Sequence, residues 1–339
     1  MARWDQQTRR RRRDIRQTQV AGALAAILMI TGLTQAQGGD LPPMKRRQQG
    51  ILTGMPFMAN LASRTFVDDL DRKIYLAKAP IRIVSLAPSV TEILFAIGVS
   101  ERIVGVTQFC DYPPEAQAKP KVGASQPNIE SLLALNPDLV IAPRAFIRPD
   151  VLDKLDQLKI TVYILEAKTI EDILSHIQTL GRMLDRPAAA DDLATSMRRR
   201  ITDVKTRTQA LTRPRLLYVL NSDPLVTVGP GSFIHQLIEL AGGSNVGTAM
   251  QTPYPRLSLE EAIRQDPEII VFPVGTTEGI PETEQQRWRR WPTMSAVKQG
   301  RFYRISSVLL DRPGPRIVEG LEALARSIHP EAFESRRSQ

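Results

Sequence analysis

Several predicted strands of this chain are followed by loop residues whose side chains could bind a ligand. In an open α/β sheet, ligands bind outside the carboxyl ends of the strands, so these loops form the candidate site. The candidate ligand-binding residues are Pro88, Ser89, Phe109, Tyr112, Ser125, Gln126, Arg144, Asn221, Tyr254 and Arg312.

Two kinds of side chain in this set indicate what it could bind. The aromatic rings of Phe109, Tyr112 and Tyr254 can stack on a flat or macrocyclic ligand. Arg144 and Arg312 can meet a carboxylate or a phosphate. Each aromatic residue, taken alone, is also explained by packing, and Tyr112 directly precedes two prolines in a turn.

No sequence motif for catalysis accompanies these residues. The chain has neither a Gly-x-Ser-x-Gly elbow nor a phosphate-binding glycine loop with a lysine. The glycine-rich stretch 228–232 precedes a predicted helix, and a tight turn explains its glycines better than an anion site. We therefore predict no catalytic residue. The alternative is an α/β enzyme that uses Asp111, Glu92 or Asp311 as acid or base.

Alternating strands and helices must position the candidate residues. Arg82–Leu86 reads as a strand, and the apolar spacing after it predicts a helix that Gly98 stops. The same alternation returns after Pro214. It predicts an α/β fold of two doubly wound lobes with mostly parallel sheets. The expected lobes are residues 65–168 and 213–332, with a tail at 333–339.

Helices are predicted between the lobes, over residues 169–212. After Pro187, apolar residues recur at helical spacing as far as Leu211. At 1.5 Å per residue, such a helix would be about 36 Å long. It is long enough to join the two lobes as a backbone helix.

One stretch of sequence occurs twice. "NIESLLALNPDLVIAP" (128–143) aligns without a gap with "SLEEAIRQDPEIIVFP" (258–273). The alignment pairs Glu130 with Glu260 and Pro137 with Pro267. Each copy reads as a short helix, a proline that ends it, and a buried strand. The repeat favours two related lobes.

Composition excludes several kinds of protein. One cysteine, Cys110, allows no intramolecular disulfide. Three widely separated histidines (His176, His235 and His329) argue against a zinc site of the histidine-cluster kind, and we predict no metal site. No basic stripe with interleaved aromatic residues appears in the body of the chain, so we expect no nucleic-acid partner.

The amino terminus resembles an export signal. Arginines at 9–13 and at 16 precede an apolar run, Val20–Leu33, and small residues follow at Thr34 and Ala36. This order predicts a signal peptide over 1–36. The run is shorter than the roughly 20 residues that span a bilayer, so cleavage is favoured over an uncleaved anchor. Residues 37–64 read as a flexible lead. We expect an exported protein, in the periplasm or at the outer face of the cytoplasmic membrane.

Four stretches together resemble a known family: "RIVSLAPSVTEILFAIG" (82–98), "VGVTQFCDYPPEA" (104–116) and the two repeat copies in their context. They look like the substrate-binding proteins of ABC importers for cobalamin, haem and ferric siderophores, the class III periplasmic binding proteins. The resemblance covers about residues 65–330 and is closest to the cobalamin branch. It implies two lobes joined by a long helix, with a ligand between them.

The resemblance also implies a role for the repeated glutamates. In the family, one glutamate on each lobe docks onto arginines of the membrane permease, and Glu130 and Glu260 occupy the matching positions. A two-fold permease needs the same contact on each half of its receptor. The alternative is that each glutamate only stabilises the start of its helix.

The expected function follows from these points. We expect a monomer that binds cobalamin or a related corrinoid between its lobes and delivers it to the permease dimer, with no resident cofactor. A ferric siderophore or haem is the alternative ligand, because the cobalamin branch lines its site with tryptophans that this chain lacks at the matching loops. A third possibility is a surface interaction protein without a small ligand.

Overall fold

The computed structural model describes residues 64–124, 126–275 and 279–334 of the chain. The predicted signal peptide, nearly all of the predicted lead, Ser125 and the last five residues lie outside this part. Within it, no helix combines the length and the apolar character needed to cross a membrane.

The first lobe contains a four-stranded sheet and a small hairpin. All strands of the sheet are parallel, in the order β4-β3-β5-β6. The sequence 65–76 predicts this hairpin, with its turn near Asp71. The hairpin is antiparallel, and Asp71 takes the left-handed conformation at the turn (φ 58°). The elements are β1 Thr65–Val67, β2 Lys73–Tyr75, β3 Ile83–Ser85, α3 Pro88–Ala96, β4 Ile103–Val106, α4 Ile129–Ala134, β5 Leu139–Pro143, α5 Pro149–Gln157 and β6 Val162–Leu165.

The second lobe repeats this arrangement. Its four-stranded parallel sheet has the order β10-β7-β11-β12, which matches the first sheet strand for strand. A short antiparallel hairpin, β8-β9, follows β7. The elements are β7 Arg215–Tyr218, β8 Asn221–Ser222, β9 Leu225–Val226, α8 Phe233–Leu240, β10 Ser244–Asn245, α9 Leu259–Arg264, β11 Ile269–Val274, α10 Glu282–Trp288, α11 Ser295–Lys298, β12 Phe302–Ser306, α12 Ser307–Leu310 and α13 Ile317–Ile328.

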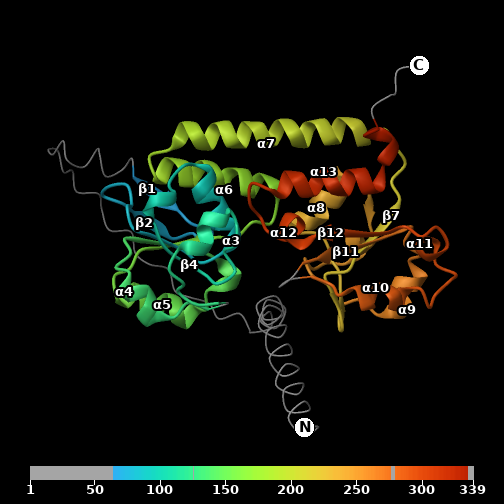
Figure 1. The fold of residues 1–339 in the computed structure, drawn as a ribbon, viewed down its shortest axis with the longest axis horizontal. Helices are drawn as coiled ribbons and strands as arrows, with labels where there is room; N and C mark the ends of the chain where they lie inside the picture. The colour runs from blue at the N-terminus through green and yellow to red at the C-terminus, as the bar shows by residue number, and fades with distance from the viewer. Residues whose placement is uncertain (1–63, 125, 276–278, 335–339) are drawn as a thin grey trace, which may run out of the picture.

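Two helices connect the lobes: α6 Ile170–Met183 and α7 Pro187–Thr208. Helix α7 has 22 residues, which makes it about 33 Å long, and it runs across both lobes along one side of the molecule (Figure 1). Pro187 is its first residue, where the missing N–H costs no hydrogen bond. The predicted linking helix is therefore present.

Strands with continuous apolar sequence lie in the middle of each lobe because both faces of each sheet are covered. In β5, Leu139 and Ile141 join a core cluster that extends through both lobes, whereas Val140 and Ala142 join a second cluster within the first lobe. In β11, Ile269 and Ile270 divide in the same way. The core shared between the lobes makes them one packed body.

Both copies of the repeat fold into the same unit. Asn128 and Ser258 cap the helices, since their side chains accept hydrogen bonds from the N–H groups of Ser131 (2.8 Å) and Glu261 (3.1 Å). The residue before each proline takes a left-handed conformation: Asn136 has φ 44° and Asp266 has φ 45°. This conformation lets the chain leave the helix and enter the strand.

The acid that follows each proline ties the unit to the neighbouring strand. Asp138 accepts a hydrogen bond from the backbone N–H of Arg82 (3.0 Å), and Glu268 accepts one from that of Arg215 (2.9 Å). The two arginines in turn donate to carbonyl oxygens at the ends of α4 and α9. The repeat therefore encodes a helix-to-strand junction, and the sequence alignment missed its arginine because that residue lies outside the repeated stretch.

Some local predictions were wrong. Pro88 and Ser89 form the first turn of α3 rather than a separate exit from β3. The sequence 315–328 predicts a closing helix with Pro315 in its first turn, but Pro315 lies before α13, whose first residue is Ile317. Helices α10, α11 and α12 were not predicted, since each has seven residues or fewer and shows no repeated apolar period.

Candidate functional site

The lobes meet where the segment before α13 contacts the first lobe. Arg312 follows α12 and has only 6% of its surface exposed. Its Nη1 lies 2.6 Å from Oδ1 of Asp111, and its Nη2 lies 3.3 Å from Oδ2. Asp111 belongs to the loop after β4, so this two-point ion pair joins one lobe to the other.

A second arginine makes a parallel connection. Arg316 donates from Nε and Nη2 to the carboxylate of Glu92 on α3, at 2.9 and 2.6 Å. Its guanidinium carbon also lies 3.8 Å from the centre of the Tyr112 ring. We call Glu92, Asp111, Tyr112, Arg312 and Arg316 the interlobe cluster.

A glycine allows the two backbones to come this close. A Cβ atom added to Gly314 would lie 3.3 Å from the carbonyl oxygen of Ser89 and 3.4 Å from its Cα. A larger side chain there would push the lobes apart. The Gly314 N–H donates to the carbonyl of Arg312 (2.8 Å), which turns the segment so that both arginines face α3 and the β4 loop.

Burial and pairing act against each other on the carboxylates of the cluster. Burial raises the pKa of Asp111, but the hydrogen bonds and charge of Arg312 outweigh it and hold that pKa below its usual value. Glu92 has 3% of its surface exposed, and there burial wins: its pKa is raised although Arg316 and Arg312 oppose the rise. Desolvation outweighs the combined effect of the pairing only at Glu92, where water is nearly excluded.

Tyrosines surround a third carboxylate, Asp311. The Tyr218 hydroxyl donates to Oδ1 of Asp311. Burial, together with the charges of Asp311 and Glu166, raises the pKa of Tyr254 to about 12. The Tyr254 hydroxyl therefore stays protonated and can donate a hydrogen bond at any physiological pH.

The arginine predicted in the first lobe is paired as well. Arg144 lies in a short 3-10 helix, Arg144–Phe146, after β5, and its Nη1 lies 3.0 Å from Oε2 of Glu166. Lys168 contacts the same carboxylate at 3.2 Å. More than half of the Arg144 side chain is exposed, so this pair is weaker than those of the interlobe cluster.

The remaining predicted ligand-binding residues differ in accessibility. Ser125 lies outside the described residues, and Gln126 and Phe109 are half-buried. Pro88 and Ser89 are buried in the first turn of α3. The Asn221 side chain donates to the Pro224 carbonyl (2.7 Å) within the β8-β9 hairpin. Tyr112, at 44% exposed, offers the largest accessible ring.

Sequence reasoning missed one arginine of the interlobe cluster, Arg316. It stands at the end of "DRPGPR" (311–316), where two prolines and a glycine mark a fixed turn. That turn was the available signal. The loop-after-strand rule selected Arg312, four residues earlier, and stopped there.

Each carboxylate of the enzyme alternative has a partner within the protein. Glu92 pairs with Arg316, Asp111 with Arg312, and Asp311 accepts from Tyr218. A general base must have an oxygen within reach of a substrate proton. A network that occupies these oxygens suits binding between the lobes better than acid–base chemistry.

The predicted docking glutamates lie at equivalent places. Glu130 and Glu260 are the second residues of α4 and α9, and both are exposed. These helices lie on the side of the molecule opposite α7 (Figure 1). Among the described residues neither carboxylate has an ion-pair partner, whereas the adjacent Glu261 is held by Arg264 (2.7 Å). The pair could therefore meet cations of another protein.

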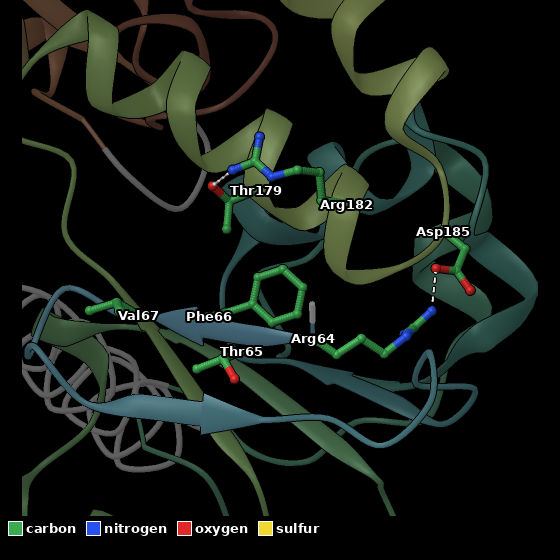
Figure 2. Close-up of a pocket in the computed structure, with 7 residues that line it drawn as sticks. All are labelled: Arg64, Thr65, Phe66, Val67, Thr179, Arg182 and Asp185. Carbon is green, nitrogen blue, oxygen red and sulfur yellow. Dashed lines mark hydrogen bonds and ion pairs between the residues drawn. The ribbon is translucent and has the colours of Figure 1, made fainter. Parts of the chain in front are cut away.

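A cavity of about 500 Å³ lies away from the lobe junction (Figure 2). Strand β1 and the end of α6 form it, and its lining residues are Arg64, Thr65, Phe66, Val67, Thr179, Arg182 and Asp185. Its charged groups engage their neighbours: Arg64 pairs with Asp185, and Arg182 donates to the Thr179 hydroxyl (2.8 Å). None of the predicted site residues reaches it.

Known proteins are similar to this chain in sequence and in fold. Residues 83–309 match the family described as periplasmic binding protein. A vitamin B12-binding protein of Vibrio cholerae is 33% identical over 243 residues, which are 71% of this chain and 86% of that protein.

Solved structures agree. The crystal structure of the periplasmic vitamin B12-binding protein of Vibrio cholerae is 31% identical, with a TM-score of 0.66 over 76% of this chain and 99% of that one. A periplasmic haem-binding protein from Roseiflexus is 25% identical, with a TM-score of 0.65 over 74% of this chain and 98% of that one. The chain therefore belongs to the periplasmic binding protein family that serves ABC importers, in its cobalamin, haem and siderophore class.

Proposed function

We propose that this protein is the exported receptor of an ABC importer and that it binds cobalamin or a related corrinoid between its lobes. Fold and family support the receptor role. The observation that carries the choice of ligand is the charge balance between the lobes, where every arginine of the candidate site is paired with a carboxylate of the protein itself.

Charge pairing favours a neutral ligand. Four cationic side chains (Arg144, Lys168, Arg312, Arg316) and four carboxylates (Glu92, Asp111, Glu166, Asp311) cancel one another. Cyanocobalamin carries no net charge, and amide groups surround its corrin ring. Such a ligand needs hydrogen-bond partners such as Tyr254, and ring contacts such as Tyr112, rather than free cations.

Haem or a ferric siderophore is the second candidate. The haem-binding relative has a similar fold, and these ligands carry carboxylates or other anionic groups. Arg144 is the most exposed arginine of the candidate site, and its pair with Glu166 is the easiest for an anionic ligand to replace. This candidate predicts that the ligand separates Arg144 from Glu166.

Calorimetric titration of the full chain tests the ligand. We expect one-to-one binding of cyanocobalamin, with haem and a ferric siderophore as parallel titrations. The R144Q variant should bind cyanocobalamin as the wild type does. If haem or the siderophore binds and cyanocobalamin does not, the corrinoid assignment is wrong and the importer role remains.

A further inference from the structure

Arg316, in the second lobe, contacts two residues of the first lobe, one buried and one exposed. Its fork holds Glu92, which is almost fully buried on α3, while the face of its guanidinium covers the ring of Tyr112 at 3.8 Å. Glu92 and Arg316 are 224 residues apart in the chain. One side chain of the second lobe therefore holds an aromatic residue of the first.

The geometry suits holding a ring more than supplying charge. Arginine presents a rigid, planar fork, so two hydrogen bonds to Glu92 fix the plane in which the guanidinium lies. A cation over an aromatic face is attracted to it, and more strongly where water is excluded. Tyr112 is still 44% exposed beside this arginine, so its ring remains available to a ligand.

The neighbouring ion pair supports the same loop. Arg312 binds the carboxylate of Asp111, the residue directly before Tyr112. The loop after β4 is thus held at two successive residues from the opposite lobe. A loop on the first lobe alone would have to order its ring when the ligand arrives, at a cost in entropy.

We propose that Arg316 is a positioning residue, which fixes the ring of Tyr112 in its ligand-binding orientation before the ligand arrives. This inference rests on the proposed binding of a ligand between the lobes. It adds that the binding surface of the first lobe is completed by a side chain of the second. Arg316 itself does not need to touch the ligand.

A spectroscopic test needs no ligand. The full chain is labelled with 3-fluorotyrosine, and the ¹⁹F resonance of Tyr112, one of six tyrosines, is assigned with Y112F. We expect R316Q to move this resonance toward the value of a free tyrosine. The control is R200Q, which breaks an equally two-pronged pair between Arg200 on α7 and Glu322 on α13 (2.7 and 3.0 Å) and should leave it unchanged. An unmoved Tyr112 resonance in R316Q overturns the proposal.

A binding cycle then links the ring to the ligand. We expect R316Q and Y112A each to weaken cyanocobalamin binding by roughly tenfold, and the double variant to lose no more than either alone. R200Q should bind as the wild type does. Additive losses, or wild-type binding by Y112A, contradict the positioning role. A moved ¹⁹F resonance with no cyanocobalamin binding by the wild type supports the positioning and rejects the corrinoid instead.

Discussion

Single residues decide which charges this protein offers to a ligand. Arg312 was predicted to meet a ligand carboxylate, but its guanidinium already binds Asp111 and is almost fully buried. Arg316, which was not predicted, supplies the contact with Tyr112. Arg312 therefore forms an ion pair, as its residue type suggests, but its partner is a carboxylate of the protein itself.

The pairing of Asp111 should make the stability of the protein depend on pH. Its pKa is held below the usual 3.8, so its stabilising effect is complete above that pH and is lost as the pH falls through the lower folded-state pKa. We expect wild type to have a higher free energy of unfolding than D111N at pH 6, and the difference to shrink below pH 3.8. Urea unfolding followed at a series of pH values measures this.

The control for that series is D192N, which removes an exposed aspartate of α7 for which the described residues show no ion pair. The loss of any one negative charge would affect both variants alike. If D111N and D192N change in parallel with pH, the ion pair with Arg312 contributes nothing measurable.

The two lobes resemble each other in their secondary-structure elements. The sheets have the same strand order, and each repeat copy joins a capped helix to a central strand through a left-handed residue and a proline. The acid after the proline satisfies backbone N–H groups of the neighbouring strand. This junction is what the two halves share most closely.

Removal of either junction acid should therefore have a similar effect. We expect D138A and E268A each to lower the free energy of unfolding by about 0.5 to 1.5 kcal/mol, because exposed strand N–H groups lose a hydrogen bond that water replaces only in part. Lys154 is exposed on α5, so K154A should change stability by less than about 0.5 kcal/mol. Denaturant unfolding measures all three variants. A large loss for one acid alone would contradict the equivalence of the junctions.

The close contact between helices α6 and α7 leads to a second prediction about the elements. A Cβ atom added to Gly181 on α6 would lie 2.2 Å from the Cβ of Ala190 on α7, so these helices pack with no room for a methyl group. We expect G181A to destabilise the protein by about 1 to 3 kcal/mol, although alanine favours helices. S175A, at an exposed position of α6, is the control. A thermal melt in which G181A is as stable as S175A would show that the helices can separate freely.

The molecule as a whole is one packed body. One apolar core extends through both lobes, α7 crosses them (Figure 1), and the ion pairs of the interlobe cluster join them as well. This construction favours small changes in lobe separation over wide opening. It also holds the exposed glutamates of α4 and α9 apart on two fixed lobes, which the hypothesis of docking to a two-fold permease requires.

Charge reversal tests the docking role. We expect E130K combined with E260K to abolish transport while ligand affinity stays at the wild-type value, since exposed carboxylates that meet arginines set register and encounter rate. The control is D191K combined with D192K, with the same change in charge on α7, on the opposite side of the molecule; among the described residues neither aspartate forms an ion pair. Uptake of labelled ligand by cells or proteoliposomes, with calorimetry of the same variants, measures both properties. Transport that survives would leave the glutamates only their role at the helix starts.

Local features of the sequence determined much of the fold. Helix caps, prolines, glycines and runs of apolar residues act over a few positions, so they predicted the hairpin turn at Asp71, the long helix α7, both copies of the repeat and the two-lobed α/β architecture. They failed for the short helices α10 to α12, which are stabilised by packing rather than by their own periodicity.

Tertiary structure alone decided how the candidate site is arranged. Sequence patterns placed Tyr112 and Arg312 in loops after predicted strands, but not the Arg316–Glu92 pair, which joins residues 224 positions apart. The balance between burial and pairing at Glu92 and Asp111 likewise depends on which groups the fold brings near them. Such contacts leave no periodic signal in a single sequence, because the energy of an ion pair depends on distance in space and on exclusion of water, and not on separation along the chain.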